Sequence, residues 1–597
     1  MQKYHEQLYV ISFLAMIKRI ILLLFAFYLP ALTVFGQYPL SIQYVDKPLD
    51  ADKIINKAKF KKKYKSRTSL DYDLQKLVVR LHKQGFDAAC LDSVFIDENK
   101  YAANVYIGQK LTVSHVNIEG LEKEQLRTMK IKPLITEHKS VHINDIFAYN
   151  DKIANTLWNT GYLFATAKLN NFTPSDSGYT ASILVEKNNF ILLDSIIVAG
   201  NLKLGKSFLY GYLGLKRKKA YNEAVMKQVP ARMQELEFAD VLQPPGVSFS
   251  DKEAALYIYA NKQKTNQFDG YLGIVPSNEN DSSKILVTGS LTLDLHNVFK
   301  VGENLKFNWK RIQVLSQTLD IYMDFPYIFY SCFGIDGAFA LEKKDTSYIN
   351  MEFLVGLRYY LQQKNYLRAY YNLKTAHLIS NTSLEYLTEL PTDIDYSTNI
   401  YGLEMVFSKL DYLFNPRKGY AFSVTTAVGQ RNIIKNNNIA DSLYNGIALT
   451  SIQLQFIGKF DVYFPIKKRW VWYIGAKTGH LQANQLFENE VFRLGGLNTL
   501  RGFDQHSIYA STYGIINNEL RFIFGKKSYL QVFFDAAWYE CKLNNGYRSD
   551  IPFGFGAGIS FDIKAGIFAL NYALGKQLNN PIKFNNGKIT FGYTALF

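Results

Sequence analysis

The chain has 597 residues, which is too long for one ordinary domain, so several folded units are expected. Hydrophobic residues make up 48% and charged residues 20%, as in ordinary folded proteins, and the mean hydropathy of -0.11 excludes a membrane protein built from many helices. The formal net charge of +16 would suit nucleic-acid binding, but the densest basic run, residues 57–67 (KAKFKKKYKSR), is better interpreted as a solvated helix end and linker. Contact of this run with anionic lipid headgroups is the weaker alternative.

Aromatic residues are unusually abundant at 15%, almost all of them Tyr (42) and Phe (42). These residue types favour β-strands, and rings of aromatic side chains mark both rims of membrane β-barrels. A large soluble β-rich protein has the same composition, so composition alone leaves both open. The three cysteines, Cys90, Cys332 and Cys541, lie far apart, which argues against a disulfide framework and against a cysteine metal site.

The N-terminus has the features of a secretory signal peptide. Residues 16–37 (MIKRIILLLFAFYLPALTVFGQ) combine a short basic start, an apolar run and a small residue, Gly36, at the expected cleavage point. We therefore predict a signal peptide at residues 1–36, with either Met1 or Met16 as the true start. The apolar run is about ten residues long, too short for a membrane-spanning helix of about twenty. Because no longer apolar run follows, a membrane protein of this sequence would span the bilayer with strands.

Residues 38–265 contain a repeated pattern of strands and amphipathic helices. Helices are predicted at residues 70–83, 151–159 and 222–236, the last of them interrupted by Pro230. Each is followed by a two-strand pattern. The first two end at Gly85 and Gly161, since glycine readily adopts the left-handed conformation of a helix C-terminus. The repeat predicts an array of small domains, each built as strand, helix, helix, strand, strand.

From residue 267 to residue 597 the sequence alternates with a period of two. In one segment Leu305, Phe307 and Trp309 alternate with polar neighbours, and about sixteen such segments follow one another. An even number lets an antiparallel sheet close on itself, which hydrocarbon requires because it cannot satisfy a free strand edge. We predict a transmembrane barrel in preference to a soluble β-domain.

The last segment of the chain is expected to close this barrel. Residues 588–597 (KITFGYTALF) place Phe591, Tyr593 and Phe597 on one face, and the chain ends inside the strand. Pairing of this segment with the first barrel segment, residues 268–275, would form a seam.

One motif stands out in the barrel half. The segment RLGGLNTLRGF contains Arg501, Gly502 and Phe503, and two acidic residues follow, Glu519 in NNELRF and Asp535 in FFDAA. Alternation with the apolar residues of their strands turns both carboxylates towards the lumen. A guanidinium group can bridge two carboxylates with directional, charge-assisted hydrogen bonds, and glycine permits close backbone approach.

The repeats, the barrel and this motif together resemble the BamA/TamA superfamily of outer-membrane assembly and translocation proteins, most closely the TamA type. The resemblance implies N-terminal α+β repeats, called POTRA domains, followed by an antiparallel transmembrane β-barrel of about 16 strands. The implied divisions are a signal peptide (1–36), POTRA 1 (37–110), POTRA 2 (111–189), POTRA 3 (190–266) and the barrel (267–597).

The resemblance also implies a place for the motif. Arg501, Gly502 and Phe503 would lie at the tip of a long extracellular loop that folds back into the lumen, where Asp535 and Glu519 would be partners. The chain departs from the family pattern at Leu500, where Val is common, and at Ala537, where the family has Gly. A routine lumen salt bridge that braces a loop is the alternative to a functional motif.

The implied localisation is the outer membrane, with the POTRA domains in the periplasm. The implied partners are unfolded outer-membrane or secreted protein clients, outer-membrane lipid and a periplasmic or inner-membrane protein, with no nucleic acid. We find no P-loop, no metal cluster and no credible catalytic triad in the sequence, and so expect neither enzymatic activity nor a cofactor. Three functions compete: an insertase, favoured by three POTRA units; a two-partner secretion pore for one dedicated client, which usually has two; and a plain outer-membrane channel or surface antigen.

Overall fold

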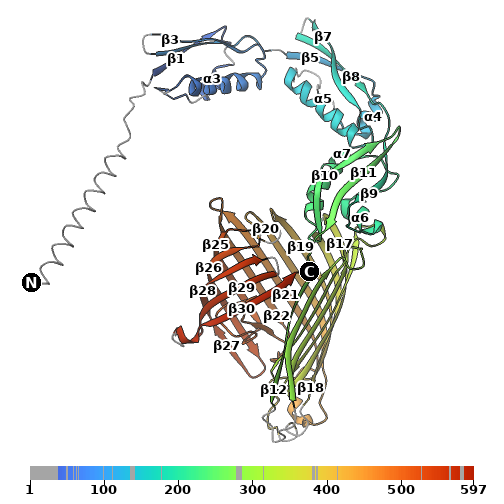
Figure 1. The fold of residues 1–597 in the computed structure, drawn as a ribbon, viewed down its shortest axis with the longest axis vertical. Coiled ribbons are helices and arrows are strands. Elements are labelled where there is room, and N and C mark those ends of the chain that lie inside the picture. Colours follow the sequence, from blue (N-terminus) through green and yellow to red (C-terminus); the bar gives the residue numbers. More distant parts are fainter. Residues whose placement is uncertain are drawn as a thin grey trace, which may run out of the picture. The chain divides into compact units, whose positions relative to one another are not determined.

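The computed structural model describes residues 38–596 apart from short gaps, the longest of which are 135–140 and 277–284 (Figure 1). The predicted signal peptide, residues 1–36, and Phe597 lie outside the described residues. The chain forms two compact units that divide between Phe190 and Ile191. Three small α/β domains precede a large β-barrel, in agreement with the predicted fold class.

The first α/β domain has one sheet with the strand order β2-β1-β4-β3. Its central strands β1 and β4 are parallel, and β3 is antiparallel to β4. Four leucines recur at helical spacing along α3 and bury one face of that helix, with Ser66 as the N-cap. The elements are β1 (Tyr38–Val45), α2 (Asp52–Lys57), β2 (Lys63–Tyr64), α3 (Arg67–His82), β3 (Cys90–Asp97) and β4 (Lys100–Tyr106).

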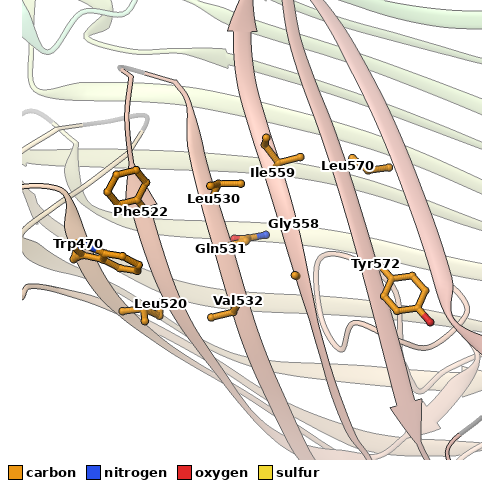
Figure 2. A pocket seen from close by; sticks show the side chains of 11 residues that line it. Trp470, Leu520, Phe522, Leu530, Gln531, Val532, Gly558, Ile559, Leu570 and Tyr572 are labelled. Carbon is orange, nitrogen blue, oxygen red and sulfur yellow. The ribbon is translucent and has the colours of Figure 1, made fainter. Parts of the chain in front are cut away.

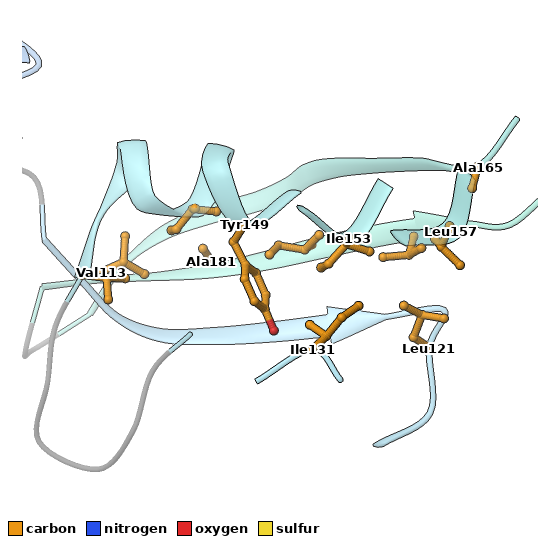
Figure 3. Packing of buried hydrophobic residues seen from close by; sticks show 12 residues of the cluster. Val113, Leu121, Ile131, Tyr149, Ile153, Leu157, Ala165 and Ala181 are labelled. Carbon is orange, nitrogen blue, oxygen red and sulfur yellow. The ribbon is translucent and has the colours of Figure 1, made fainter. Parts of the chain in front are cut away.

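The second α/β domain repeats this arrangement, with the order β6-β5-β8-β7. Figure 3 shows its core, in which Ile153 and Leu157 of the helix meet Ala181 and neighbouring apolar residues of the sheet. Gly161 after the helix has a positive φ of 102°, as predicted for a helix-ending glycine. The elements are β5 (Thr112–Glu119), α4 (Lys123–Thr128), β6 (Val141–His142), α5 (Ile143–Trp158), β7 (Thr166–Ser175) and β8 (Gly178–Glu186).

The third α/β domain belongs to the same compact unit as the barrel. Its sheet has the order β10-β11-β9, and the single helix predicted at residues 222–236 is instead two short helices, because Pro230 can only occupy the first turn of a new helix. The elements are β9 (Leu192–Ala199), α6 (Lys206–Leu213), α7 (Glu223–Met226), α8 (Val229–Gln234), β10 (Ala239–Phe249) and β11 (Glu253–Lys262).

The barrel is an antiparallel sheet in which each strand pairs with the next along the chain. It has sixteen strands when β27 and β28 are taken as one strand broken at Ile551 and Pro552, which agrees with the predicted number. The barrel strands are β12 (Gln267–Pro276), β13 (Ile285–His296), β14 (Asn304–Gln313), β15 (Ser316–Phe325), β16 (Phe333–Lys344), β17 (Tyr348–Gln362), β18 (Asn365–Leu378), β19 (Tyr396–Leu410), β20 (Gly419–Ile433), β21 (Thr450–Pro465), β22 (Trp470–Gln482), β25 (Thr512–Ile523), β26 (Tyr529–Leu543), β27 (Gly546–Asp550), β28 (Phe553–Ile563), β29 (Gly566–Lys576) and β30 (Lys588–Leu596).

The outer surface of the barrel is apolar because side chains alternate along each strand. On β22, for example, Trp470 and Trp472 are exposed while Val471 and Tyr473 are buried. This outer surface carries a hollow of about 690 Å³, lined mainly by apolar side chains of β22, β25, β26, β28 and β29. Figure 2 shows the side chains that line it. The hollow is therefore part of the lipid-facing band and not an active-site cleft.

The two ends of the barrel differ. The chain enters and leaves it at the end that carries Gln267 and Leu596, here called the proximal end, and short turns join most strands there. At the opposite, distal end, long connections join β18 to β19, β20 to β21 and β22 to β25. Among the described residues, no helix is both long and apolar enough to cross a bilayer.

Candidate functional site

The longest distal connection, residues 483–511, carries the predicted motif. It forms a small hairpin of β23 (Phe492–Leu494) and β24 (Ile508–Ala510), and Arg501 lies between these two strands. The Arg501 Nε and Nη2 atoms donate to the two oxygens of Asp535 at 2.6 and 2.5 Å, and Nη1 donates to Glu519 at 2.7 Å. The structure thus brings together the three charged residues that the sequence analysis singled out.

These charges are removed from water, and neighbouring groups complete their bonding. Asp535 has no exposed surface, and it also accepts a bond from the backbone N–H of Arg501 at 3.2 Å. The guanidinium group of Arg501 lies 3.8 Å from the ring centre of Phe533, close enough for a cation–π interaction. Glu519 is shared with Arg521, whose Nε donates to it at 2.6 Å. Removing one member would leave an uncompensated buried charge.

Gly502 allows the motif to lie against the barrel wall. Its φ is +94°, and a Cβ atom there would fall 2.6 Å from the carbonyl oxygen of Leu574 on β29. The barrel wall carries no side chains at this point, since Gly554 and Gly575 face the motif. A Cβ on Gly554 would lie 1.9 Å from the carbonyl oxygen of Arg501, and a Cβ on Gly575 would lie 2.9 Å from the ring of Phe503. The contact of Gly554 and Gly575 with the motif was not predicted from the sequence.

A second anchor holds the same connection to the opposite wall. Arg493 of β23 donates to Glu342 of β16 and to the hydroxyl of Tyr348 on β17. Lys344, also on β16, donates to the hydroxyl of Tyr509 on β24 at 3.1 Å. Sequence reasoning missed this anchor, because Arg493 was noted only as the first residue of the motif.

Residues 485–490 hold the distal loops together. Glu490 accepts from Arg431 of β20 at 3.0 Å, and both side chains are almost completely buried. Asn489 donates from its side chain to the carbonyl oxygen of Ile394 at 2.8 Å, and Gln485 donates to the carbonyl oxygen of Gly446 at 3.0 Å. The three long connections therefore form one interlocked cap, which we call the distal cap, with a shared hydrophobic core around Phe487.

A buried carboxyl group lies in this cap without a compensating hydrogen bond at one oxygen. Burial raises the pKa of Asp393 to about 6, and the positive charges of Lys344 and Arg493 offset this only in part. Asp393 Oδ1 has no hydrogen-bond partner among the described residues.

The predicted seam residues lie at the end of the sheet. Strands β12 and β30 pair at Gln267 with Leu596 and at Phe268 with Ala595, and at no further position among the described residues. On β30, Phe591 is 65% exposed on the outer surface, and the ring of Tyr593 lies 4.6 Å from that of Phe568 on β29. Phe597, the third predicted seam residue, lies outside the described residues.

The described part of the chain contains no cluster of three or more His, Cys, Asp or Glu side chains arranged to hold a metal ion. The charged groups of the Arg501 cluster are paired with one another. What this arrangement can do is hold a loop inside a barrel and leave one sheet edge unpaired.

Comparisons with known proteins agree with this geometry. The Omp85 superfamily domain matches residues 297–593, which include the motif and most of the barrel. No curated protein matches the sequence significantly.

Among solved structures, CdiB from Escherichia coli is similar with a TM-score of 0.54 and 16% identity, over 89% of this chain and 98% of that one. CdiB from Acinetobacter baumannii has a TM-score of 0.53 and 12% identity, over 88% and 98%. BamA from Haemophilus ducreyi lacking POTRA domains 1–3 has a TM-score of 0.43 and 14% identity, over 81% of this chain and 100% of that one.

At these identities the similar structures establish the fold, and the family match establishes the relationship. The α/β domains resemble POTRA domains, and the barrel has the number of strands that the resemblance implied. The chain is a BamA/TamA-like member of the Omp85 superfamily of outer-membrane protein insertion and translocation factors.

Proposed function

We propose that this protein inserts client β-barrel proteins into the outer membrane, with its three POTRA domains, at residues 37–110, 111–189 and 190–266, in the periplasm. The observation that carries the proposal is the seam. Strands β12 and β30 pair at two positions, whereas β19 and β20 pair along their whole lengths, from Tyr396 with Ile433 to Leu410 with Gly419. Unpaired backbone groups at a strand edge can bond to an incoming strand, so the open part of the seam offers a template for a client hairpin.

The distal cap favours sideways release over passage through the lumen. A client that left through the distal end would have to break the buried ion pair of Arg431 and Glu490, at a cost of about 3–5 kcal/mol, and the shared core around Phe487 as well. Opening the seam separates only the two paired positions of β12 and β30, and an incoming client strand can bond to the backbone groups that this exposes. The small number of paired positions supports an exit into the membrane.

The α/β domains offer edges that could receive an unfolded client. The outer strands of the three sheets include β3, β7 and β10, and β9 forms the other edge of the third sheet. Strand β10 contains Pro244 and Pro245, which lack N–H groups, and its register with β11 is interrupted by two bulges. Such features block strand addition, so we propose that clients bind to β3 and β7 and not to β10.

The role of Arg501, Gly502 and Phe503 in this function is to hold the long distal connection against β25, β26 and β29. Because Gly502 touches β29, the strand next to β30, the motif is well placed to affect the seam. The alternative is that the motif only braces the loop and has no effect on activity. The Arg501→Ala variant distinguishes these two roles.

Depletion of the protein in its host, followed by quantitative profiling of outer-membrane and secreted proteins, tests the proposed function. We expect broad loss of outer-membrane barrels. Loss of one secreted protein alone would instead identify a two-partner secretion pore, and unchanged protein levels with altered solute uptake would identify a plain channel.

The seam can be tested separately with a cysteine pair. Phe268 of β12 pairs with Ala595 of β30, so a disulfide in an F268C/A595C variant would lock the seam. The native Cys90 and Cys332 are replaced by Ser in this background. We expect assembly activity to be lost on oxidation and restored by a reductant, with the F268C variant unaffected by either; full activity of the oxidised pair would contradict a role for seam opening.

A further inference from the structure

Two neighbouring turns at the proximal end of the barrel carry aromatic side chains that the protein leaves uncovered. The turn between β13 and β14 projects Phe299, which is 61% exposed, next to the exposed Val298. The turn between β15 and β16, which contains the short 3-10 helix η2 (Ile328–Tyr330), projects Phe329, which is 86% exposed. A large apolar side chain with so little contact gains nothing from burial within the protein.

The backbone of the second turn is held in a costly conformation. Tyr327, Phe329 and Tyr330 all have positive φ values, of 53°, 52° and 57°. Each non-glycine residue in this region costs about 1–2 kcal/mol. For Tyr327 packing offsets the cost, because its ring is buried against those of Phe208 and Tyr212 on α6 and stacks on Tyr360 at 4.4 Å. No such packing offsets the cost at Phe329.

Helix α6 of the third α/β domain holds both turns. The hydroxyl of Ser207 donates to the carbonyl oxygen of Tyr327 at 3.2 Å and accepts from the backbone N–H of Tyr330 at 2.7 Å. The backbone N–H of Gly205 donates to the carbonyl oxygen of Lys300 in the first turn at 2.5 Å. A Cβ on Gly211 would lie 2.8 Å from the carbonyl oxygen of Ser331, so the helix lies directly on the second turn. The position of the two exposed rings is therefore fixed relative to this domain.

The exposed rings continue the lipid-facing band of the barrel. Strand β16 begins two residues after the second turn, and its first outward side chains, Phe333 and Ile335, are exposed to lipid. Met323 near the end of β15 is exposed in the same way. Beyond the end of such a band lies the headgroup region, where aromatic side chains are favoured because their edges tolerate water while their faces remain apolar.

We propose that Phe299 and Phe329 insert into the headgroup region of the proximal membrane leaflet and form a lipid-binding surface that fixes the third α/β domain to the membrane. The occupant is phospholipid, since the surface is continuous with the band that already faces lipid. Through Ser207 and Gly205 the contact of two turns with lipid sets the orientation of α6, and with it that of the domain.

Spin labels test this proposal in the full-length mature protein reconstituted in phospholipid nanodiscs. Cys90, Cys332 and Cys541 are replaced by Ser, and single cysteines are introduced as F299C or F329C, with K252C in the exposed β10–β11 turn as the water-exposed control and F353C on the outer face of β17 as the lipid-exposed control. Relaxation of each label by oxygen, which partitions into lipid, is compared with relaxation by a water-soluble nickel chelate.

We expect the labels at residues 299 and 329 to be relaxed several-fold less by the nickel chelate than the label at residue 252, with oxygen accessibility between the values at residues 252 and 353. Nickel accessibility equal to that at residue 252 would overturn the proposal. Heat-dependent gel mobility of each variant verifies that the barrel is folded. A second measurement uses the unlabelled F299D/F329D variant, in which the label at residue 252 should become more mobile in nanodiscs; unchanged mobility would contradict the orienting role.

Discussion

At the residue scale, the Arg501 cluster gives the most direct test of the lumen motif. Arg501→Ala removes the partner of Asp535, which is fully buried, and of Glu519, so about 3–5 kcal/mol of local stabilisation should be lost. We expect the long distal connection to detach from β29 and assembly activity to fall at least about tenfold, since 1.4 kcal/mol already corresponds to a factor of ten. Activity is measured as insertion of a reporter barrel protein into vesicles.

The control for this variant is Arg548→Ala, which removes an exposed arginine from β27. Both variants should retain the gel mobility shift of a folded barrel. If Arg501→Ala assembles clients as well as the unmodified protein does, the motif only braces the loop.

Asp393 gives a prediction on pH dependence. Its folded-state pKa is raised to about 6 by burial, above the ordinary value of about 4, so the folded protein binds this proton more tightly than the unfolded chain does. The group therefore favours the folded state at low pH, and this contribution is lost as the pH rises from about 4 to 6. Asp393→Asn should stabilise the protein by about 1–2 kcal/mol at pH 7.5, after allowance for solvent screening, and by much less at pH 4.5.

Thermal unfolding in detergent at the two pH values measures this difference. A matched change at an exposed position, Asp441→Asn in the β20–β21 loop, should have little effect at either pH. Equal destabilisation by Asp393→Asn at both values would show that the buried charge is not the cause.

Sequence reasoning identified those site residues whose position follows from strand alternation. Glu519 and Asp535 alternate with apolar neighbours, so their orientation towards the lumen could be predicted, and Arg501 was the cation expected to bridge them. The contacts of Gly554 and Gly575 with the motif could not be predicted, because these contacts depend on how a loop from an earlier part of the chain folds back. Arg493 was missed for the same reason, since its partner Glu342 lies on the opposite wall.

At the element scale, periodicity predicted the repeated domains and the strands because each element buries one face. The interruption predicted at Pro230 is the break between α7 and α8, because this proline lies in the first turn of α8. The two-residue strands β2 and β6 are too short to have a periodicity and were not predicted.

The distal cap makes a prediction about elements that meet only in the folded barrel. Glu490→Ala leaves Arg431 buried without a carboxylate, which should cost about 3–5 kcal/mol and loosen the three long connections. We expect a higher ion conductance in planar bilayers and greater sensitivity of cells to large hydrophilic antibiotics.

Replacing both partners, as R431M/E490L, should recover much of the stability because no charge is left unpaired. Lys435→Ala, which breaks an exposed pair with Asp441, is the matched control and should leave conductance unchanged. Unchanged conductance in Glu490→Ala would mean that the cap does not close the distal end.

At the scale of the whole molecule, the barrel combines two kinds of wall. Strands β17 to β20 are long, pair along most of their lengths and carry partly buried lumen ion pairs such as Arg368 with Glu404 at 3.0 Å. The wall that ends in β30 has shorter strands, several glycines on its inner face and a seam of two paired positions. Alternation along the sequence predicted that the sheet would close, but not how weakly, since pairing between the first and last strands depends on the curvature of the whole sheet.

This difference predicts where the barrel opens first. Local opening free energies follow the number and burial of backbone hydrogen bonds, so β12 and β30 should exchange their amide hydrogens fastest and β19 and β20 slowest. Hydrogen exchange of the protein in nanodiscs, followed by mass spectrometry, measures both. The F268C/A595C disulfide should slow exchange in β12 and β30 by at least about tenfold and leave β19 and β20 unchanged, because a covalent link removes opening at the seam without altering the opposite wall. If β12 and β30 are already as protected as β19 and β20, the seam is not the weak point of the barrel, and the proposed exit into the membrane loses its physical basis.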